Sequence, residues 1–166
     1  MFGKIDLVPW GKLKHAYGDA VDAPKWIRAF DSVEEEDRME AINYFLLSCA
    51  FHQYTLYTVT PFVIPFVIEA LESATLGERS TGMCSSMKLE LIHFLRLCAQ
   101  CGQRAMYGHP SPQAPTVEDS IFAGEELYQR CVEDSDERVR SDALWLLDFC
   151  RAGKAVRNRS KLPFQN

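Results

Sequence analysis

The first residues whose spacing could do chemistry are Cys98 and Cys101, a Cys-x-x-Cys pair. This spacing occurs in redox motifs and in half of a zinc site. A zinc site needs two further ligands at compatible spacing, and the redox motif needs a βαβ context. The sequence around the pair offers neither. We therefore interpret these thiols as small buried hydrophobic residues at the end of a core helix, and expect the other four cysteines to be reduced as well. Those four are Cys49, Cys84, Cys131 and Cys150.

The histidines predict no metal site and no cofactor, because none of them has the His-x-x-x-His spacing that places two ligands on one helix face. They are His15, His52, His93 and His109. We expect His93 to be a core or interface residue. His52 and Gln53 with Tyr54 and Tyr57 could form a small polar pocket, since His and Tyr can transfer protons. No nucleophile motif, phosphate-binding glycine loop or carboxylate pair accompanies them. We therefore predict structural hydrogen bonding at a turn between repeats, and no enzyme activity.

Composition limits the class of protein further. The chain has 166 residues, of which 47% are hydrophobic, and 18 Lys and Arg against 23 Asp and Glu give a formal net charge of -5. These values are typical of a globular protein and argue against nucleic acid as a partner, because a nucleic-acid surface must neutralise phosphates. Asp6 and Pro9 interrupt the apolar stretch that an N-terminal signal peptide would need. The apolar stretch from Val59 to Leu71 is too short to cross a membrane. We expect a cytoplasmic protein.

Nearly every apolar segment has the helical period, so we predict an all-α fold in one domain over residues 1–153, with a basic tail over 154–166 that frays. Asp22, Ser32 and Thr116 are the predicted helix caps. Pro61 and Pro65 argue against a strand in the aromatic segment after residue 50. Residues 102–115 are expected to form an irregular loop. The predicted helices cover residues 23–31, 34–50, 61–74, 86–101, 117–133 and 136–151.

Two segments one hundred residues apart resemble each other. Placing residues 36–47 over residues 136–147 aligns Glu-Asp-Arg-Met with Asp-Glu-Arg-Val, and Phe-Leu-Leu with Trp-Leu-Leu. Fixed-period similarity between helical units is typical of an α-solenoid, in which each helix pair buries its apolar stripe against the next. A compact orthogonal bundle is the alternative.

The segment Asp136-Glu-Arg-Val-Arg-Ser-Asp-Ala-Leu is similar to the acid-x-x-Val-Arg-x-x-Ala-Leu pattern of HEAT and HEAT-like repeats, which include the phycobilisome-lyase type. Residues 10–75 resemble a group of bacterial HEAT-repeat proteins, whereas residues 76–115 depart from that group. The resemblance implies about three HEAT-like helix pairs, and we assign Trp10, His15 and Tyr17 to an N-terminal capping segment. The matching positions are Trp10, Leu13, His15, Ala16, Tyr17, Gly18, Ala20, Asp22 and Pro24, then His52, Gln53, Thr55 and Tyr57, then Ile64, Pro65, Phe66 and Val67.

The same resemblance implies a binding protein, since the group resembles immunity partners of bacterial toxins and no catalytic residue carries over. Acidic clusters at residues 34–37 and 133–137 suit helix starts, and stacked repeats would align them as a negative rim that attracts a protein with a basic surface. A general scaffold is the alternative. A HEAT-like DNA glycosylase is disfavoured by charge, and no residue identifies a lyase site. The candidate partner-binding residues are Glu34, Glu35, Asp37, Glu69, Glu72, His109, Glu133, Asp134 and Asp136.

Overall fold

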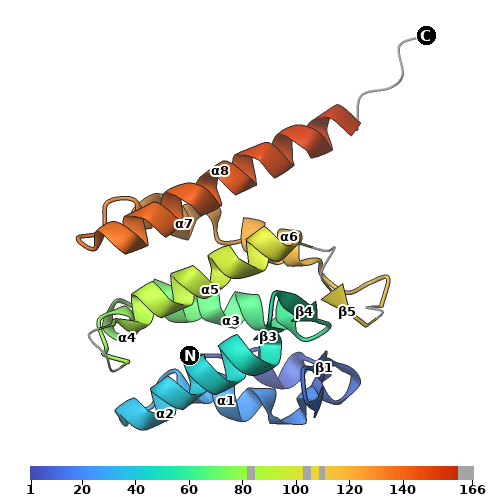
Figure 1. Cartoon of the computed structure of the whole chain (residues 1–166), viewed down its shortest axis with the longest axis vertical. Coiled ribbons are helices and arrows are strands. Elements are labelled where there is room, and N and C mark those ends of the chain that lie inside the picture. The colour runs from blue at the N-terminus through green and yellow to red at the C-terminus, as the bar shows by residue number, and fades with distance from the viewer. Residues whose placement is uncertain (82–84, 103–105, 109–110, 161–166) are drawn as a thin grey trace.

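The computed structural model describes residues 1–81, 85–102, 106–108 and 111–160. It is mainly helical, which confirms the all-α class. The α-helices lie in three layers stacked along the long axis (Figure 1). They are α1 (Ala23–Ala29), α2 (Glu35–Glu40), α3 (Thr60–Glu72), α4 (Ala74–Gly77), α5 (Met87–Cys101), α6 (Val117–Phe122), α7 (Glu125–Cys131) and α8 (Glu137–Ser160), with a π-helix η4 (Ala41–Ala50) and 3-10 turns η1 (Ile5–Leu7), η2 (Trp10–Lys12) and η3 (Ala20–Asp22).

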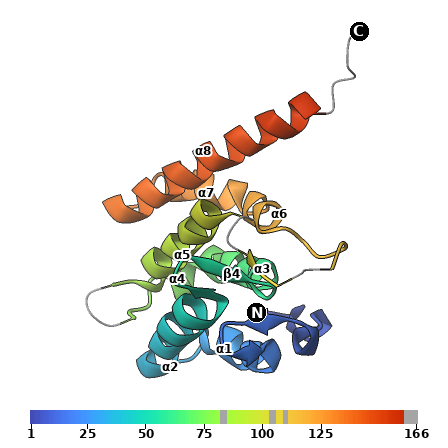
Figure 2. The ribbon, with the colours of Figure 1, turned by 45° about the vertical axis from the view of Figure 1, so that its right-hand side comes forward.

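The layers follow the order of the chain. The first holds α1, α2 and η4, the second α3, α4 and α5, and the third α6, α7 and α8. Helix α5 packs against η4 on one side and α8 on the other, while α3 packs on α5 and α7 on α8. Figure 2 shows the same order from a second direction. The middle position of α5 explains why so much of its circumference is apolar, as its sequence predicted.

Two short β-structures were not predicted. β1 (Lys14–His15) pairs antiparallel with β2 (Gly18–Asp19). β3 (Phe51–His52) forms an antiparallel hairpin with β4 (Thr55–Tyr57), and β5 (Met106–Tyr107) lies parallel to β4. The expectation that residues 51–60 contain no strand was therefore wrong. Part of the predicted loop also joins this sheet, because Tyr107 lies opposite Tyr57. Strands of two or three residues are too short to show an alternating pattern.

The predicted helix 117–133 is two helices, α6 and α7, separated at Gly124. The hydroxyl of the buried Tyr128 donates to the Ile121 carbonyl at 3.0 Å, and it lies 2.5 Å from where a side chain on Gly124 would begin. The last helix was also predicted too short. It continues to Ser160, so residues 154–160 are helical rather than frayed. Gly153 lies inside this helix, and a Cβ at this position would lie only 2.3 Å from the Phe122 ring, so the packing requires glycine here.

Two of the three predicted caps act differently from the prediction. The Thr116 hydroxyl accepts from the Asp119 N–H at 3.0 Å, which confirms that cap. The Asp22 carboxylate makes no cap and instead accepts from the Trp26 indole at 2.9 Å. The Ser32 hydroxyl accepts from the Glu34 N–H at 3.2 Å, before α2 begins.

The cysteines behave largely as core residues. Cys49, Cys98, Cys131 and Cys150 are buried and Cys101 is half-buried; all five are free thiols, and Cys84 lies outside the described residues. Burial raises the pKa of Cys98 well above that of an ordinary thiol, which makes it less reactive. These placements confirm the interpretation of the Cys-x-x-Cys pair as part of the core.

The repeat aligns in a different register from the predicted one. Arg38 donates to the Ser32 and Val33 carbonyls, and Arg140 donates in the same way to the carbonyls of residues 134 and 135, so the equivalent arginines lie 102 positions apart. The buried stripes match at 101 positions instead. The first unit thus has one more residue between its arginine and its stripe than the last unit has, and this residue lies directly before the π-helix η4. The first stripe is Ala41, Ile42, Phe45, Leu46 and Cys49, and the second is Asp142, Ala143, Leu146, Leu147 and Cys150.

Candidate functional site

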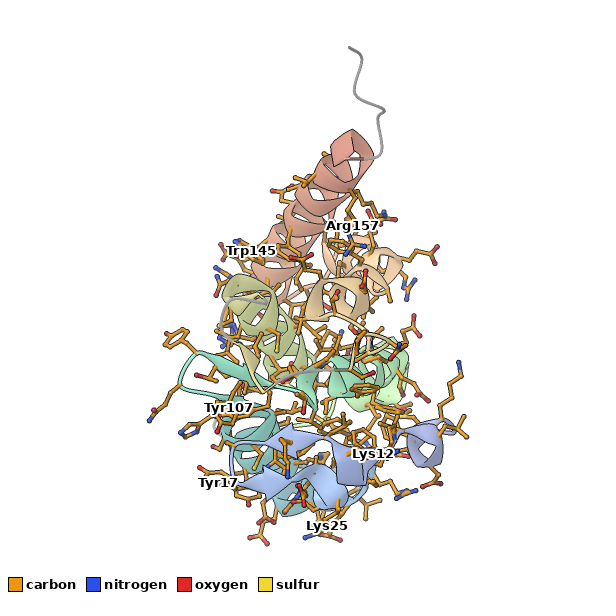
Figure 3. The ribbon with its side chains drawn as sticks, turned by 90° about the vertical axis from the view of Figure 1, so that its right-hand side faces the viewer. Lys12, Tyr17, Lys25, Tyr107, Trp145 and Arg157 are labelled. Carbon is orange, nitrogen blue, oxygen red and sulfur yellow. The ribbon has the colours of Figure 1, made fainter. Side chains whose placement is uncertain are left out.

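The rings of Tyr17, Tyr44 and His52 are in contact where the β-hairpins meet η4, and Tyr54 and Tyr107 are exposed on the adjoining β3–β4–β5 sheet. We name these four tyrosines and the histidine the tyrosine surface. Tyr17 is 61% exposed, Tyr44 41%, Tyr54 72% and Tyr107 67%. The Tyr17 and Tyr44 rings are parallel within 2°, with centroids 6.3 Å apart, and His52 meets Tyr17 edge-on at 5.9 Å. In Figure 3, Tyr17 and Tyr107 lie on the same side of the molecule. Tyr17 and Tyr54 come from the turns of the two hairpins, Tyr44 from η4 and Tyr107 from β5.

Buried hydrogen bonds fix the backbone beneath these rings. The hydroxyl of Thr60, at the start of α3, donates to the Ala50 carbonyl at 2.6 Å and accepts from the Tyr57 N–H at 2.9 Å. The Ala16 N–H donates to the Cys49 carbonyl at 3.0 Å. Together these bonds hold both hairpins against the end of η4. The tyrosine surface is therefore presented by a rigid support rather than by loose loops.

The turn between β3 and β4 is strained. Gln53 and Tyr54 have φ values of 47° and 60°, so both occupy the left-handed region. Two-residue hairpin turns of this kind favour Asn-Gly, and other residues cost about 1 to 2 kcal/mol each there. Here the strained position carries the most exposed tyrosine of the surface. Backbone strain retained at an exposed aromatic residue points to a role for that side chain.

The structural hydrogen bonding predicted at this turn is made by the backbone, through the pairing of His52 with Thr55 and the bond from the Tyr57 N–H to Thr60. Within the described ranges, no hydrogen bond joins the His52 ring to another residue, and its contact is with Tyr17. His15 is the structural histidine instead, since its Nε2 lies 3.1 Å from an Asp22 oxygen and its Nδ1 accepts from the Tyr17 N–H. The sequence pointed to residues 52–57, but it gave no signal for Tyr17, Tyr44 and Tyr107 as their neighbours.

The predicted capping segment is only partly a cap. Trp10 and His15 are buried, and the Trp10 indole donates to the Ile5 carbonyl at 2.7 Å while its ring contacts Phe66 on α3. Tyr17 faces solvent and belongs to the tyrosine surface.

Only some of the predicted acidic residues are exposed together on one edge of the molecule. The starts of α2, α5 and α8 point to the same edge, on the left in Figure 1, and Glu34, Glu35 and Asp37 are exposed there. Glu133 is also exposed, and in the described part of the chain neither it nor Glu34 or Glu35 has a basic partner. His109 lies outside the described residues.

The remaining four predicted acids are engaged within the protein. Asp134 lies 2.8 Å from Lys88, Asp136 lies 2.8 Å from Arg138, and Glu72 lies 3.3 Å from Arg130. The Glu69 carboxylate accepts from the Phe2 N–H at 2.6 Å. Their negative charges are partly compensated, so the rim is less acidic than the sequence suggested.

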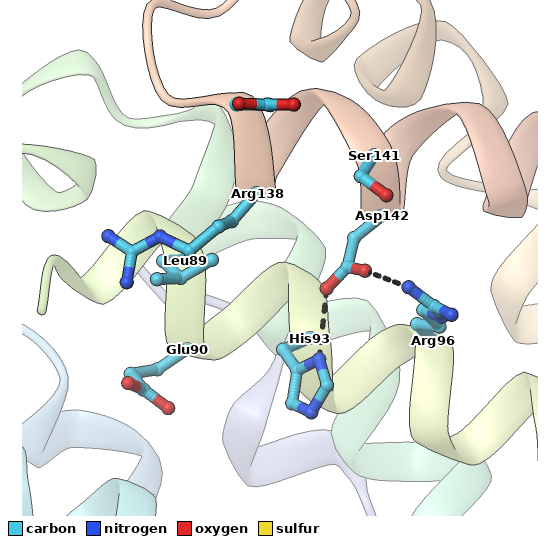
Figure 4. A pocket seen from close by; sticks show the side chains of 8 residues that line it. Leu89, Glu90, His93, Arg96, Arg138, Ser141 and Asp142 are labelled. Carbon is cyan, nitrogen blue, oxygen red and sulfur yellow. Dashed lines mark hydrogen bonds and ion pairs between the residues drawn. The ribbon is translucent and has the colours of Figure 1, made fainter.

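A groove of about 520 Å³ lies between α5 and α8 (Figure 4). The Asp142 side chain, only 7% exposed, lies 2.9 Å from His93 Nδ1 and also pairs with Arg96. A His–Asp pair orients the base in many hydrolases. Here the carboxylate serves two partners and ties α8 to α5, which confirms His93 as an interface residue. The lining residues are Leu89, Glu90, His93, Arg96, Glu137, Arg138, Ser141 and Asp142.

Neither a metal cluster nor a membrane span emerges from the described residues. No group of three or more His, Cys, Asp or Glu side chains among them could hold a metal ion, and none of their helices is both long and apolar enough to cross a bilayer. Comparisons with protein-family models, with curated proteins and with solved structures found no match for this chain.

Proposed function

We propose that this chain is a non-catalytic, HEAT-like binding protein that neutralises a cognate bacterial toxin by covering the toxin's active face. The observation that carries the proposal is the tyrosine surface. Tyrosine gives a large contact area with few rotatable bonds, and it is enriched in protein interfaces. A monomer has no structural need to expose four tyrosines on one rigid support. The toxin as partner comes from the resemblance of residues 10–75 to immunity proteins.

The helix arrangement supports the solenoid part of the proposal. Each layer contains a helix pair, formed by α1 with α2 and η4, by α3 with α5, and by α7 with α8. Arg38 and Arg140 make the same carbonyl contacts at the start of the first and last units. In repeat proteins of this type, outer positions can diversify toward one partner while the core keeps the fold.

The negative charge of this chain favours a partner with a basic surface. The net charge is -5, and Glu34, Glu35 and Glu133 remain exposed at the edge where helices begin. Such an edge would accelerate encounter with a basic protein, while the tyrosines would hold the complex together. Free thiols suit a reducing cytoplasm, which is where we place the interaction.

The test is co-expression with the product of the adjacent gene, since toxin and immunity genes are neighbours. We expect that product to be lethal alone, to be tolerated in the presence of this chain, and to co-elute with it on gel filtration. Tyr54→Ala with Tyr107→Ala should weaken the complex about tenfold or more. Leu144→Ala is the matched control, because Leu144 is equally an exposed apolar side chain but lies on α8.

Two results would contradict the proposal. The adjacent product could be harmless alone, or it could stay lethal in the presence of this chain without forming a complex. In either case the general scaffold interpretation would replace the immunity interpretation.

A further inference from the structure

We propose that the tyrosine surface receives an arginine or lysine side chain of the partner against the exposed sides of the Tyr17, Tyr44 and His52 rings, with Asp22 as its counter-charge. This inference deepens the proposed function and relies on it for the partner being a protein. The site would hold a cationic side chain by aromatic rings and a carboxylate.

The aromatic rings form the walls of this site. Tyr17 and Tyr44 are parallel, His52 stands at 66° to Tyr17, and Trp26 contacts Tyr44 with ring centroids 5.3 Å apart. The face of an aromatic ring is negative, so a cation within about 6 Å of several rings is attracted to each of them. Four rings in contact favour a cationic side chain more than a single exposed tyrosine would.

Asp22 supplies negative charge beside these rings. Its carboxylate accepts from the Trp26 indole at 2.9 Å and lies 3.1 Å from His15 Nε2, yet its side chain is still 37% exposed. Among the described residues it has no ion pair with a lysine or arginine. A carboxylate in this setting can accept a further hydrogen bond from an incoming guanidinium or ammonium group.

The molecule already binds one cation in this way. Lys25 Nζ lies 4.0 Å from the centroid of the Trp26 ring. The other nearby base, Lys14, pairs with Asp19. In the part of the chain that the structure describes, Lys25 and Lys14 are both engaged, so neither is free to receive a phosphate or a carboxylate. This charge pattern disfavours an anionic ligand and a nucleic acid.

The test uses two peptides that differ in one charge, acetyl-Gly-Arg-Gly-amide and the same peptide with neutral citrulline in place of arginine. Binding is followed by NMR of the Tyr17 and Tyr44 rings and of the Trp26 indole N–H. We expect saturable shifts with the arginine peptide at about millimolar concentration, and shifts at least about fivefold smaller with the citrulline peptide. Equal shifts with both peptides, or no saturable shift with either, would overturn the inference.

A matched pair of variants locates the charge. Asp22→Asn keeps an acceptor for Trp26 and should weaken arginine-peptide binding about threefold or more. Asp148→Asn removes an exposed charge on α8 and should leave binding unchanged. If Asp22→Asn fails to fold, the comparison of the two peptides on the unaltered protein still decides. Peptide binding without toxin protection would contradict only the proposed function, and toxin binding without peptide discrimination would contradict only this inference.

Discussion

Two regions of the molecule contain similar kinds of side chains but use them differently. One is the contact between α5 and α8, and the other is the tyrosine surface. Between the helices, Asp142 pairs with His93 and Arg96, and Lys88 bridges Glu78 and Asp134. At the tyrosine surface, Asp22 lacks a lysine or arginine partner within the described residues, and the aromatic rings face solvent.

We interpret this difference as one between structural interactions and proposed binding interactions. Paired charges between helices hold the helical layers together and leave few charged groups there without a partner. An exposed, strained and electrostatically unbalanced surface gains stability only when a partner covers it. The predictions that follow test whether the two regions do depend on different properties.

The largest effect is expected in the helical stack. Leu146→Ala should lower the free energy of unfolding by about 2 to 5 kcal/mol, because the residue is fully buried on α8 and truncation leaves a cavity. Urea unfolding measures this change. Leu144→Ala, on the exposed face of the same helix, should change it by less than about 0.5 kcal/mol. Equal effects of the two substitutions would mean that the buried face of α8 is wrongly assigned.

A smaller, pH-dependent effect is expected for Asp134. Burial raises the pKa of this carboxyl group, but the hydrogen bonds from Lys88 and from the Asp136 N–H outweigh burial, so the pKa is lowered in the folded protein. Asp134→Asn should therefore cost about 1 to 2 kcal/mol at neutral pH. Because the folded pKa is depressed, the stabilisation is present above the unfolded value of about 3.9 and is lost as the pH falls through the folded pKa.

Urea unfolding of both proteins between neutral pH and pH 3 measures this dependence. The difference between them should shrink only below about pH 4. A difference that does not change with pH would contradict the ion pair with Lys88.

The smallest effect is expected at the acidic edge. Reversing Glu34, Glu35 and Asp37 to lysine should slow association with the toxin severalfold and weaken its salt dependence, with dissociation nearly unchanged, because exposed charges act on encounter. Stopped-flow kinetics at several salt concentrations measure both rates. A large increase in the dissociation rate would place these acids inside the interface. It would contradict the view that the acids speed association whereas the tyrosines slow dissociation.

The sequence predicted the features that depend on periodicity. The helical class and most helix positions followed from apolar spacing. The sequence did not predict the break between α6 and α7 or the extension of α8. The two glycines in these regions are required by packing, because the Tyr128 hydroxyl lies where a Cβ on Gly124 would be and the Phe122 ring where a Cβ on Gly153 would be. Neither glycine reveals its neighbour from the sequence.

The candidate site could be predicted only in part, for a related reason. His52, Tyr54 and Tyr57 were recognised because they are adjacent in sequence. Tyr17 and Tyr44 join them only through the hydrogen bonds that seat both hairpins on η4. The acids were recognised as charges, but the basic partners of Asp134 and Glu72 lie 46 and 58 residues away, beyond the reach of local spacing.

The most direct test of the account is the double substitution Gln53→Asn with Tyr54→Gly, which installs the residues that this turn favours. If the strained turn is kept for binding, the variant should be more stable than the unaltered protein by about 1 to 3 kcal/mol in urea unfolding. The same variant should bind the toxin about tenfold or more weakly. A less stable variant would contradict the claim that the turn is strained. A variant that binds the proposed toxin as tightly as before would contradict the claim that the tyrosine surface is the binding site.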